Sequence, residues 1–328
     1  MYAIRPSPRL DGGVPVGSVV LSIDAELGWG FPDTPVPQQR VDAARTGWQA
    51  LVDMLDRYQV PATWAIVGHL FLAECDRHHE THPRGPNQFL VERTALADRP
   101  DLRFAPELID RVRTAAVDHE IASHSFSHVL FGAEETTTEV ARTELEWALE
   151  AADDADRMHS FVFPRNSIGH RDVLAEWGFG AYRGRSPYAL SAMRKLATAT
   201  ILRPRPKLVA PSIDDYGLVN VPASLYLFGF EGRARRLVQP LRGDPIVRHA
   251  VRGIDAAADS DDGIFHLWLH PNNVVDDAAV ERLDRIFQYV DDRRDDLRVE
   301  TMADVSMRAG PNQLSTASAR AEGSSFES

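Results

Sequence analysis

Residues 19–26 of the chain read VVLSIDAE, an apolar run that ends in two acidic residues. The length and β-branched content of residues 19–23 predict a buried strand. Because side chains alternate along a strand, Asp24 and Glu26 should face one side and Ala25 the other. An aspartate that simply ends a strand is the plainer interpretation of Asp24. Two acids after one apolar run make that interpretation less satisfactory and favour chemistry at the strand end.

Predicted strands alternate with predicted helices along the rest of the chain. The other strands are expected at residues 62–68, 119–123, 161–163, 181–185, 218–222, 263–270 and 297–301. The helices are expected at residues 43–58, 106–117, 135–157, 171–179, 188–200, 233–258 and 276–291. This alternation predicts an α/β fold with a parallel sheet covered by helices, either open or closed into a barrel. In such folds, functional residues collect at the carboxyl ends of the strands.

The chain is expected to form one domain, because no internal repeat or linker divides its 328 residues. We expect an N-terminal extension at residues 1–17, a catalytic domain at 18–308 and a disordered tail at 309–328. Residues 74–104 are rich in histidine, arginine and proline, which predicts a surface insertion. This insertion contains three histidines, namely His78, His79 and His82. We favour the interpretation that they lie in a solvated loop over the alternative that they form a second metal site.

Composition excludes several classes of function. The 36 basic and 48 acidic residues give a formal net charge of -12, which argues against a general nucleic-acid-binding protein. Cys75 is the single cysteine, so no intramolecular disulfide can form, and we interpret it as a bystander. No apolar stretch is long enough to span a membrane, and the N-terminus lacks the apolar core of a signal peptide. A cytoplasmic protein is therefore expected.

Polar side chains follow three more predicted strands. The segment HSFSH at residues 124–128 comes after one strand, Arg165 follows another, and His270 follows a third. Residues four apart share one face of a helical turn, so His124 and His128 could both reach one metal ion. The alternative is an ordinary helix N-terminus capped by a serine of this segment. Position and spacing leave both interpretations open.

Two histidines and one carboxylate would complete a three-ligand site with a position left for water, which is the arrangement of hydrolytic zinc centres. The second carboxylate would then be available as a general base. The motifs of competing chemistries are absent, since the sequence has no GxSxG, Walker or GxGxxG motif.

These residues occur in an order that resembles the polysaccharide deacetylase family, the NodB-homology hydrolases. The resemblance covers roughly residues 18–305 and rests on five motifs: SIDAE (22–26), ATWAIVG (62–68), HSFSH (124–128), FPRN (163–166) and HLWLHP (266–271). It implies a distorted (β/α) barrel and removal of acetyl groups from carbohydrates by a metal-dependent hydrolase. The sugar, free or carrier-linked, stays open, as does N- against O-deacetylation.

The sequence departs from the family pattern at three places. The family usually has adjacent aspartates in its first motif, whereas the second position here is Ala25, and Glu26 is expected to replace it. Arg165 follows the proline of the third motif instead of preceding it. The fourth motif has no clear counterpart, and Asp214 or Asp215 is a guess. The variant motifs resemble those of intracellular branches of the family.

The resemblance assigns a role to each residue. Glu26, His124 and His128 would hold a divalent ion, zinc by preference. Asp24 would be the general base, oriented by Arg165, and His270 would protonate the leaving amine.

Three further residues are candidates for the substrate pocket: Trp29, His266 and Trp268. Core packing is the alternative for the two tryptophans, and a hydrogen-bonded core histidine is the alternative for His266. Two rival functions remain open. One is hydrolysis of a non-peptide C–N bond in a small cyclic amide, and the other is carbohydrate binding without catalysis.

Overall fold

The computed structural model of the protein describes residues 16–31, 38–75, 78–90, 94, 96–152, 158–187, 206–229 and 243–310. Three predicted features fall wholly or largely outside these residues: the N-terminal extension, the helix at 188–200 and the tail beyond 310. The first part of the helix expected at 233–258 also lies outside them.

The described strands form one ten-stranded sheet with the order β6-β7-β5-β4-β3-β2-β1-β9-β8, and β10 also pairs with β1. Their bounds are β1 Ser18–Ala25, β2 Thr63–Ile66, β3 Glu120–Ser123, β4 Ser160–Val162, β5 Ala181–Arg183, β6 Ser212–Ile213, β7 Val219–Asn220, β8 Leu225–Tyr226, β9 Ile264–Leu269 and β10 Arg298–Glu300. All pairings are parallel except that of β6 with β7. The carboxyl ends of the parallel strands therefore meet at one edge.

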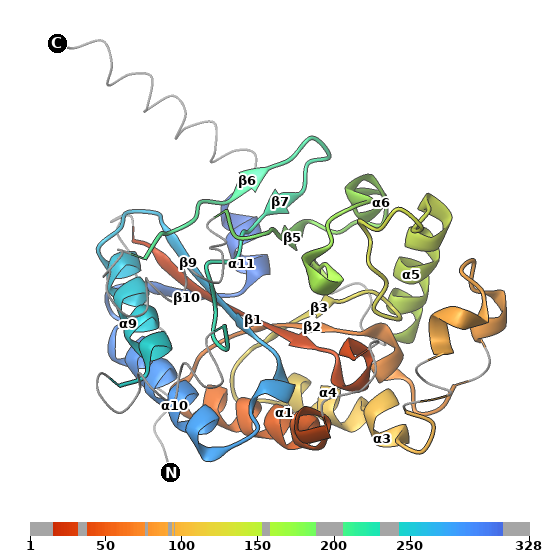
Figure 1. Ribbon diagram of the computed structural model, residues 1–328. Coiled ribbons are helices and arrows are strands. Elements are labelled where there is room, and N and C mark those ends of the chain that lie inside the picture. The colour runs from red at the N-terminus through yellow and green to blue at the C-terminus, as the bar shows by residue number, and fades with distance from the viewer. Residues whose placement is uncertain are drawn as a thin grey trace, which may run out of the picture.

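Most of the helices cover the outer face of this sheet, which curls into a half barrel (Figure 1). The last described helix, Met302–Arg308, packs on the opposite face, in one cluster with Val20 and Ala65. The bounds of the helices are α1 Gln38–Tyr58, α3 Pro100–Arg103, α4 Pro106–Arg113, α5 Thr138–Ala151, α6 Arg171–Glu176, α9 Pro245–Ala258, α10 Asp277–Asp292 and α11 Met302–Arg308. Helix α10 packs between α9 and α1, and α5 packs beside α6. The predicted fold class, a distorted (β/α) barrel, is confirmed.

Strand β1 lies at the centre of the fold and is buried along its whole length. It pairs with β9 on one edge, and with β10 and then β2 on the other. The apolar side chains of β1 pack under α1, where Trp48 stacks on Trp64 of β2 with ring centroids 5.2 Å apart. This burial of large apolar surface fixes β1, and with it the position of the acidic residues at its end.

The segment predicted as a surface insertion contributes to the core. It contains the short 3-10 helices η3 (His78–Thr81) and η4 (Pro86–Phe89), followed by α3. Phe89 and Leu96 are buried in the main hydrophobic cluster. His82 is also buried, so the expectation of a solvated loop is wrong for this histidine. Its ring contacts a carboxylate of α5, which explains how a polar side chain is tolerated there.

None of the helices in the described part of the chain is both long and apolar enough to cross a bilayer.

Candidate active site

The two carboxylates at the end of β1 enter the same cavity. Asp24 belongs to the strand, and Glu26 precedes the short 3-10 helix η1 (Leu27–Gly30). Both side chains are buried and line the cavity, while Ala25 between them packs in the hydrophobic core. The alternation expected for a strand is therefore what places both acids on one side.

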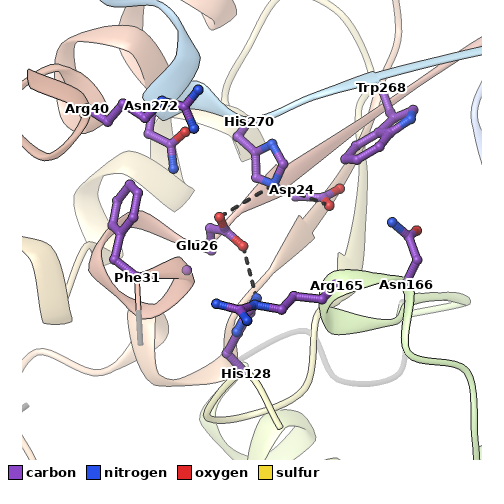
Figure 2. Close-up of a pocket in the computed structure, with 11 residues that line it drawn as sticks. Asp24, Glu26, Phe31, Arg40, His128, Arg165, Asn166, Trp268, His270 and Asn272 are labelled. Carbon is purple, nitrogen blue, oxygen red and sulfur yellow. Dashed lines mark ion pairs between the residues drawn. The ribbon is translucent and has the colours of Figure 1, made fainter. Parts of the chain in front are cut away.

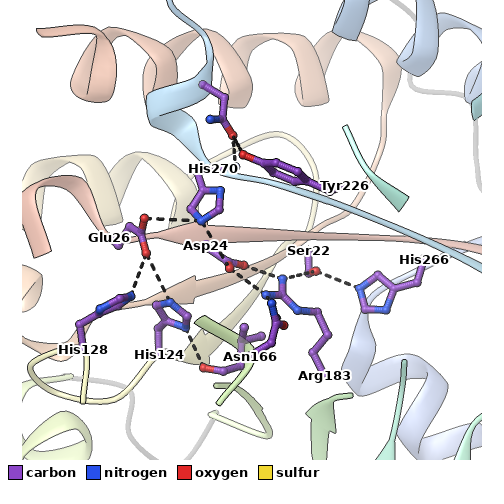
Figure 3. Close-up of polar contacts among 12 residues, drawn as sticks. Ser22, Asp24, Glu26, His124, His128, Asn166, Arg183, Tyr226, His266 and His270 are labelled. Atoms are coloured by element: carbon purple, nitrogen blue, oxygen red, sulfur yellow. Dashed lines mark hydrogen bonds and ion pairs between the residues drawn. The ribbon is translucent and has the colours of Figure 1, made fainter. Parts of the chain in front are cut away.

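Glu26 meets the two histidines of the HSFSH segment (Figure 3). Its Oε2 atom lies 3.0 Å from Nε2 of His128 and 3.6 Å from Nε2 of His124. One ligand atom from each of the three residues lies within 4.8 Å of the others, and all three residues are buried. Burial raises the pKa of the Glu26 carboxyl, but His270, His124 and His128 offset this and hold it well below its usual range. The carboxylate is therefore ionised.

The tautomer of His124 is fixed by a backbone contact. Its Nδ1–H donates to the carbonyl oxygen of Val162 over 2.7 Å. Nε2 consequently carries the lone pair, and it has no hydrogen-bond partner among the described residues. A ring nitrogen held in this way is what a metal-binding histidine requires. Burial lowers the pKa of His128, which also favours the neutral, ligating form.

The HSFSH segment is a loop rather than the helical turn expected from its spacing. Ser125 and His128 have positive φ angles of 62° and 63°, which turn the chain tightly after β3. The carboxylate of Glu144 in α5 anchors this turn, since it accepts hydrogen bonds from the backbone N–H and the hydroxyl of Ser127. His82 contacts the same carboxylate at 3.1 Å. The loop therefore depends on a buried charge in a neighbouring helix.

The arginine that pairs with Asp24 is Arg183 of β5, not Arg165 as expected. Its guanidinium donates to both carboxylate oxygens, over 2.5 and 2.7 Å, and also to the hydroxyl of Ser22 over 3.0 Å. The Trp268 ring covers it, with the guanidinium carbon 4.6 Å from the ring centroid. Burial raises the pKa of Asp24, but Arg183, His270 and His124 together outweigh this effect and the net pKa is lowered.

Arg165 has a different position in the cavity. It lies in the 3-10 turn η6 (Pro164–Asn166) with a left-handed φ of 50°, and its guanidinium extends toward His128 (Figure 2). The resemblance assigned Arg165 to Asp24 because FPRN occupies the place of the family's arginine-bearing third motif. The signal for Arg183 was a charged residue within the apolar strand β5, since a buried charge needs a partner.

His270 completes the cavity from the end of β9. Its Nε2 lies 3.5 Å from Oε1 of Glu26 and 3.7 Å from Oδ2 of Asp24. The backbone N–H of His270 donates to Oδ1 of Asn273, which also accepts from the Tyr226 hydroxyl. The imidazole is partly exposed, so it can reach both the carboxylates and a bound molecule.

The structure separates the three expected pocket residues. Trp268 lines the cavity. Trp29 does not, because it is buried in the core with its Nε1–H donating to the Arg103 carbonyl. His266 is fully buried, 2.9 Å from the Ser22 hydroxyl through Nε2, and burial lowers its pKa to about 3. The core alternative therefore holds for Trp29 and His266.

The positions of Asp214 and Asp215 do not support either residue as the counterpart of the family's fourth motif. Asp214 pairs with Arg171 and caps a turn through its Oδ1, and neither it nor Asp215 lines the cavity.

The cavity itself has a volume of about 420 Å³, within the usual range of small-ligand sites. Its remaining lining comes from the η1 and α1 side and from η6 and η7 (Pro271–Asn273), as Figure 2 shows. These residues are Gly30, Phe31, Arg40, Asn166 and Asn272. The site is thus an acidic and imidazole-rich centre with arginines and an aromatic ring at its margin.

Comparison with known proteins agrees with this geometry. Residues 30–179 match the family model described as polysaccharide deacetylase. The fold is similar to a putative polysaccharide deacetylase from Mycobacterium smegmatis, with a TM-score of 0.59, 17% identity, and coverage of 92% of this chain and 93% of that one. A search of curated proteins gave no match.

Two further solved structures share the fold. A probable polysaccharide deacetylase from Pseudomonas aeruginosa PAO1 has a TM-score of 0.54 at 13% identity and covers 88% of this chain and 89% of its own. Puue allantoinase has a TM-score of 0.54 at 10% identity, with coverage of 94% and 97%.

The curled (β/α) barrel, the family match and the residues at the strand ends together define a hydrolase of non-peptide C–N bonds. The match of residues 30–179 to the polysaccharide deacetylase model and the two similar deacetylase structures confirm the resemblance inferred from the five motifs.

Proposed function

We propose that the protein is a metal-dependent deacetylase that removes the acetyl group from an N-acetylated sugar or glycan intermediate. The observation that carries this proposal is the convergence of Glu26, His124 and His128 in the cavity that also contains Asp24 and His270.

The donor set fits a catalytic zinc ion. Two imidazoles and one carboxylate are ligands that zinc accepts, and three protein ligands leave a position for water or substrate. The Nε2 lone pair of His124 points to the shared position because Nδ1–H is already bonded to a carbonyl. When bound, a divalent ion there supplies Lewis acidity and makes water more acidic.

Asp24 is proposed as the general base. Its lowered pKa keeps the carboxylate ionised, and the two-point contact with Arg183 fixes its orientation. In that state it can accept the proton of a water molecule that attacks the acetamide carbonyl. Glu26 is committed to the histidines, so the two carboxylates have separate roles.

His270 is proposed as the general acid. Its Nε2 lies between the two carboxylates, on the open side of the cavity, where a leaving amine would depart. An amine is a poor leaving group until it is protonated, so this proton is essential to C–N cleavage. Asn273 holds the His270 backbone in place.

The cavity favours a sugar-sized substrate. Its volume suits one small molecule or one unit of a glycan, and the part of Trp268 that lines the cavity offers apolar surface for a sugar ring. Arg165, Asn166 and Asn272 provide hydrogen-bond donors around it. Residues at this margin, rather than the acid–histidine centre, would select the substrate.

The test is acetate release from a panel of N-acetylated and O-acetylated sugars, free and carrier-linked, with cyclic ureides and imides as the competing class. Zinc-loaded protein should release acetate from an N-acetylated sugar, and chelation should abolish this activity. Turnover of the cyclic amides alone would favour the allantoinase-like alternative. Full metal loading with no turnover of either class would favour a non-catalytic relative. A cytoplasmic location stays a prediction, tested by cell fractionation.

A further inference from the structure

A second cluster of metal-ligand side chains lies outside the proposed active site. It consists of His69, Cys75 and His79, with one ligand atom from each residue within 4.8 Å of the other two. His69 belongs to η2 (Gly68–Phe71), the 3-10 turn that follows β2, and is fully buried. Cys75 and His79 lie four residues apart on the segment that follows and are partly buried. None of the three lines the active-site cavity.

The donor atoms are already oriented toward one another. Sγ of Cys75 is 2.9 Å from Nε2 of His79. Nδ1 of His69 lies 3.1 Å from the carbonyl oxygen of Arg103, and since a carbonyl can only accept, Nδ1 carries the proton. Nε2 of His69 is therefore the nitrogen with the lone pair. The plainer interpretation is a hydrogen bond between Cys75 and His79 alone. It does not account for the His69 imidazole beside them, which supplies a third possible metal ligand.

Aromatic packing holds both imidazoles in place. The His69 ring lies 4.4 Å from the Trp29 ring and 5.3 Å from the His79 ring, and His79 stacks on Phe89 at 3.8 Å. Phe89 is fully buried. The two rings therefore lose little further freedom on binding an ion, which lowers the entropic cost of the site.

We infer that His69, Cys75 and His79 form a second binding site for a thiolate-preferring divalent ion, with zinc as the class of ion that suits one thiolate and two imidazoles. A water molecule would complete the four ligands. The ion would tie Cys75 and His79 to the turn after β2.

The site lies directly behind the proposed catalytic loop. The backbone N–H groups of Gly68 and His69 donate to the carbonyls of Ser125 and Phe126, over 2.8 and 3.0 Å. These two carbonyls belong to the HSFSH segment. Fixing η2 with an ion would therefore support the loop that carries His124 and His128, without contacting the substrate.

Cobalt substitution distinguishes the two sites, because only a cysteine ligand gives a thiolate-to-cobalt charge-transfer band. Cys75 is the single cysteine of the chain, and the active-site cluster contains none. The full-length protein, stripped of metal and kept reduced with a non-thiol reductant, should bind two Co²⁺ ions and develop this band. Cys75→Ser should lose the band and one ion. His128→Ala should lose the other ion and keep the band.

The matched variants make the result decisive. His69→Gln and His79→Gln should each weaken the band or shift its titration to higher cobalt concentration, whereas His249→Gln on α9 should leave it unchanged. Circular dichroism and a second variant, Cys75→Ala, control for misfolding. A single bound ion with no charge-transfer band would overturn the inference, and so would a band that survives unchanged in both histidine variants. Because the charge-transfer band is measured without substrate, a negative result in the deacetylase assay would not change how these cobalt-binding results are interpreted.

Discussion

At the scale of single residues, the acidic pair shows what sequence reasoning can reach. Alternation along β1 was enough to place Asp24 and Glu26 on one side, because it depends only on local backbone geometry. The partner of Asp24 could not be found in this way. Whether Arg165 or Arg183 reaches it depends on how the sheet curls and on the left-handed turn at η6, which are properties of the tertiary structure.

The roles of the two carboxylates can be separated by isosteric substitution. Asp24→Asn should retain the metal and lose about a hundredfold or more in kcat, because a general base is removed. Glu26→Gln should lower metal affinity and be partly rescued by excess zinc, since Glu26 contacts both histidines. Metal analysis and acetate release measure the two effects. Metal loss in Asp24→Asn with retention in Glu26→Gln would reverse the assignment.

The role of His270 can be tested through the leaving group. His270→Ala should bind metal normally but lose turnover on acetamides, because their amine must be protonated to depart. Activated acetyl esters, whose leaving groups need no proton, should lose much less. The comparison of kcat on the two substrate types is the measurement. Equal losses on both would show that His270 is not the acid.

The Asp24–Arg183 pair predicts a change in the pH profile. Arg183 is a main cause of the lowered pKa of Asp24. Arg183→Met should therefore raise that pKa, and the acid limb of kcat/KM should move to higher pH because the base must be ionised. Arg183→Lys should shift the acid limb less than Arg183→Met does. Because this variant keeps a positive charge beside Asp24, it also shows whether the effect of Arg183→Met is due to unfolding after loss of a buried charge. Arg165→Met is the matched control, and a larger shift there than in Arg183→Met would restore the original assignment.

At the scale of elements, most strands were predictable and the insertion was not. Strands such as residues 19–23 and 161–163 are short apolar runs, and the structure places β1 and β4 there. Residues 74–104 have a polar composition that favours a solvated loop. That segment nevertheless buries Phe89 and Leu96, because a few apolar residues reach the core between exposed ones. Composition averages over such residues, so it cannot reveal this packing.

Helix α5 predicts a long-range effect on the metal-binding loop. Glu144 is fully buried and anchors Ser127, so Glu144→Gln should leave one of its contacts unmade and loosen the HSFSH turn. We expect metal affinity to fall by about tenfold and the thermal midpoint to decrease. Glu146→Gln, exposed on the same helix, is the control. Unchanged affinity in Glu144→Gln would mean that the turn holds its shape without the buried charge.

At the scale of the whole molecule, the alternation of strands and helices predicted the class of fold but not the order of its strands. That β9 lies beside β1, more than two hundred residues away in sequence, follows from the way the sheet curls around a shared core. This pairing brings His270 next to Asp24 and Glu26. The site is consequently a product of topology, and the family motifs were the one sequence signal that connected its parts.

The buried histidines predict how the stability of the whole molecule depends on pH. Burial lowers the pKa of His119 from 6.5 to about 4 and that of His266 to about 3. Both therefore stay neutral in the folded protein at pH values where the unfolded chain takes up their protons. A lowered folded-state pKa gives stability that is present above the unfolded pKa and is lost as the pH falls.

As the pH falls from 6.5 to about 4, the titration of each of these histidines in the unfolded chain should thus reduce the free energy of unfolding by about 1.4 kcal/mol per pH unit. Urea unfolding of the metal-free protein across this range measures the slope. His119→Asn should flatten it by about 1.4 kcal/mol per pH unit, because the asparagine oxygen can accept the Ala62 N–H in place of Nδ1 without titrating. Similar m values in the two proteins would establish that the same transition is compared. Parallel slopes for wild type and His119→Asn would mean that His119 is not held neutral by the fold.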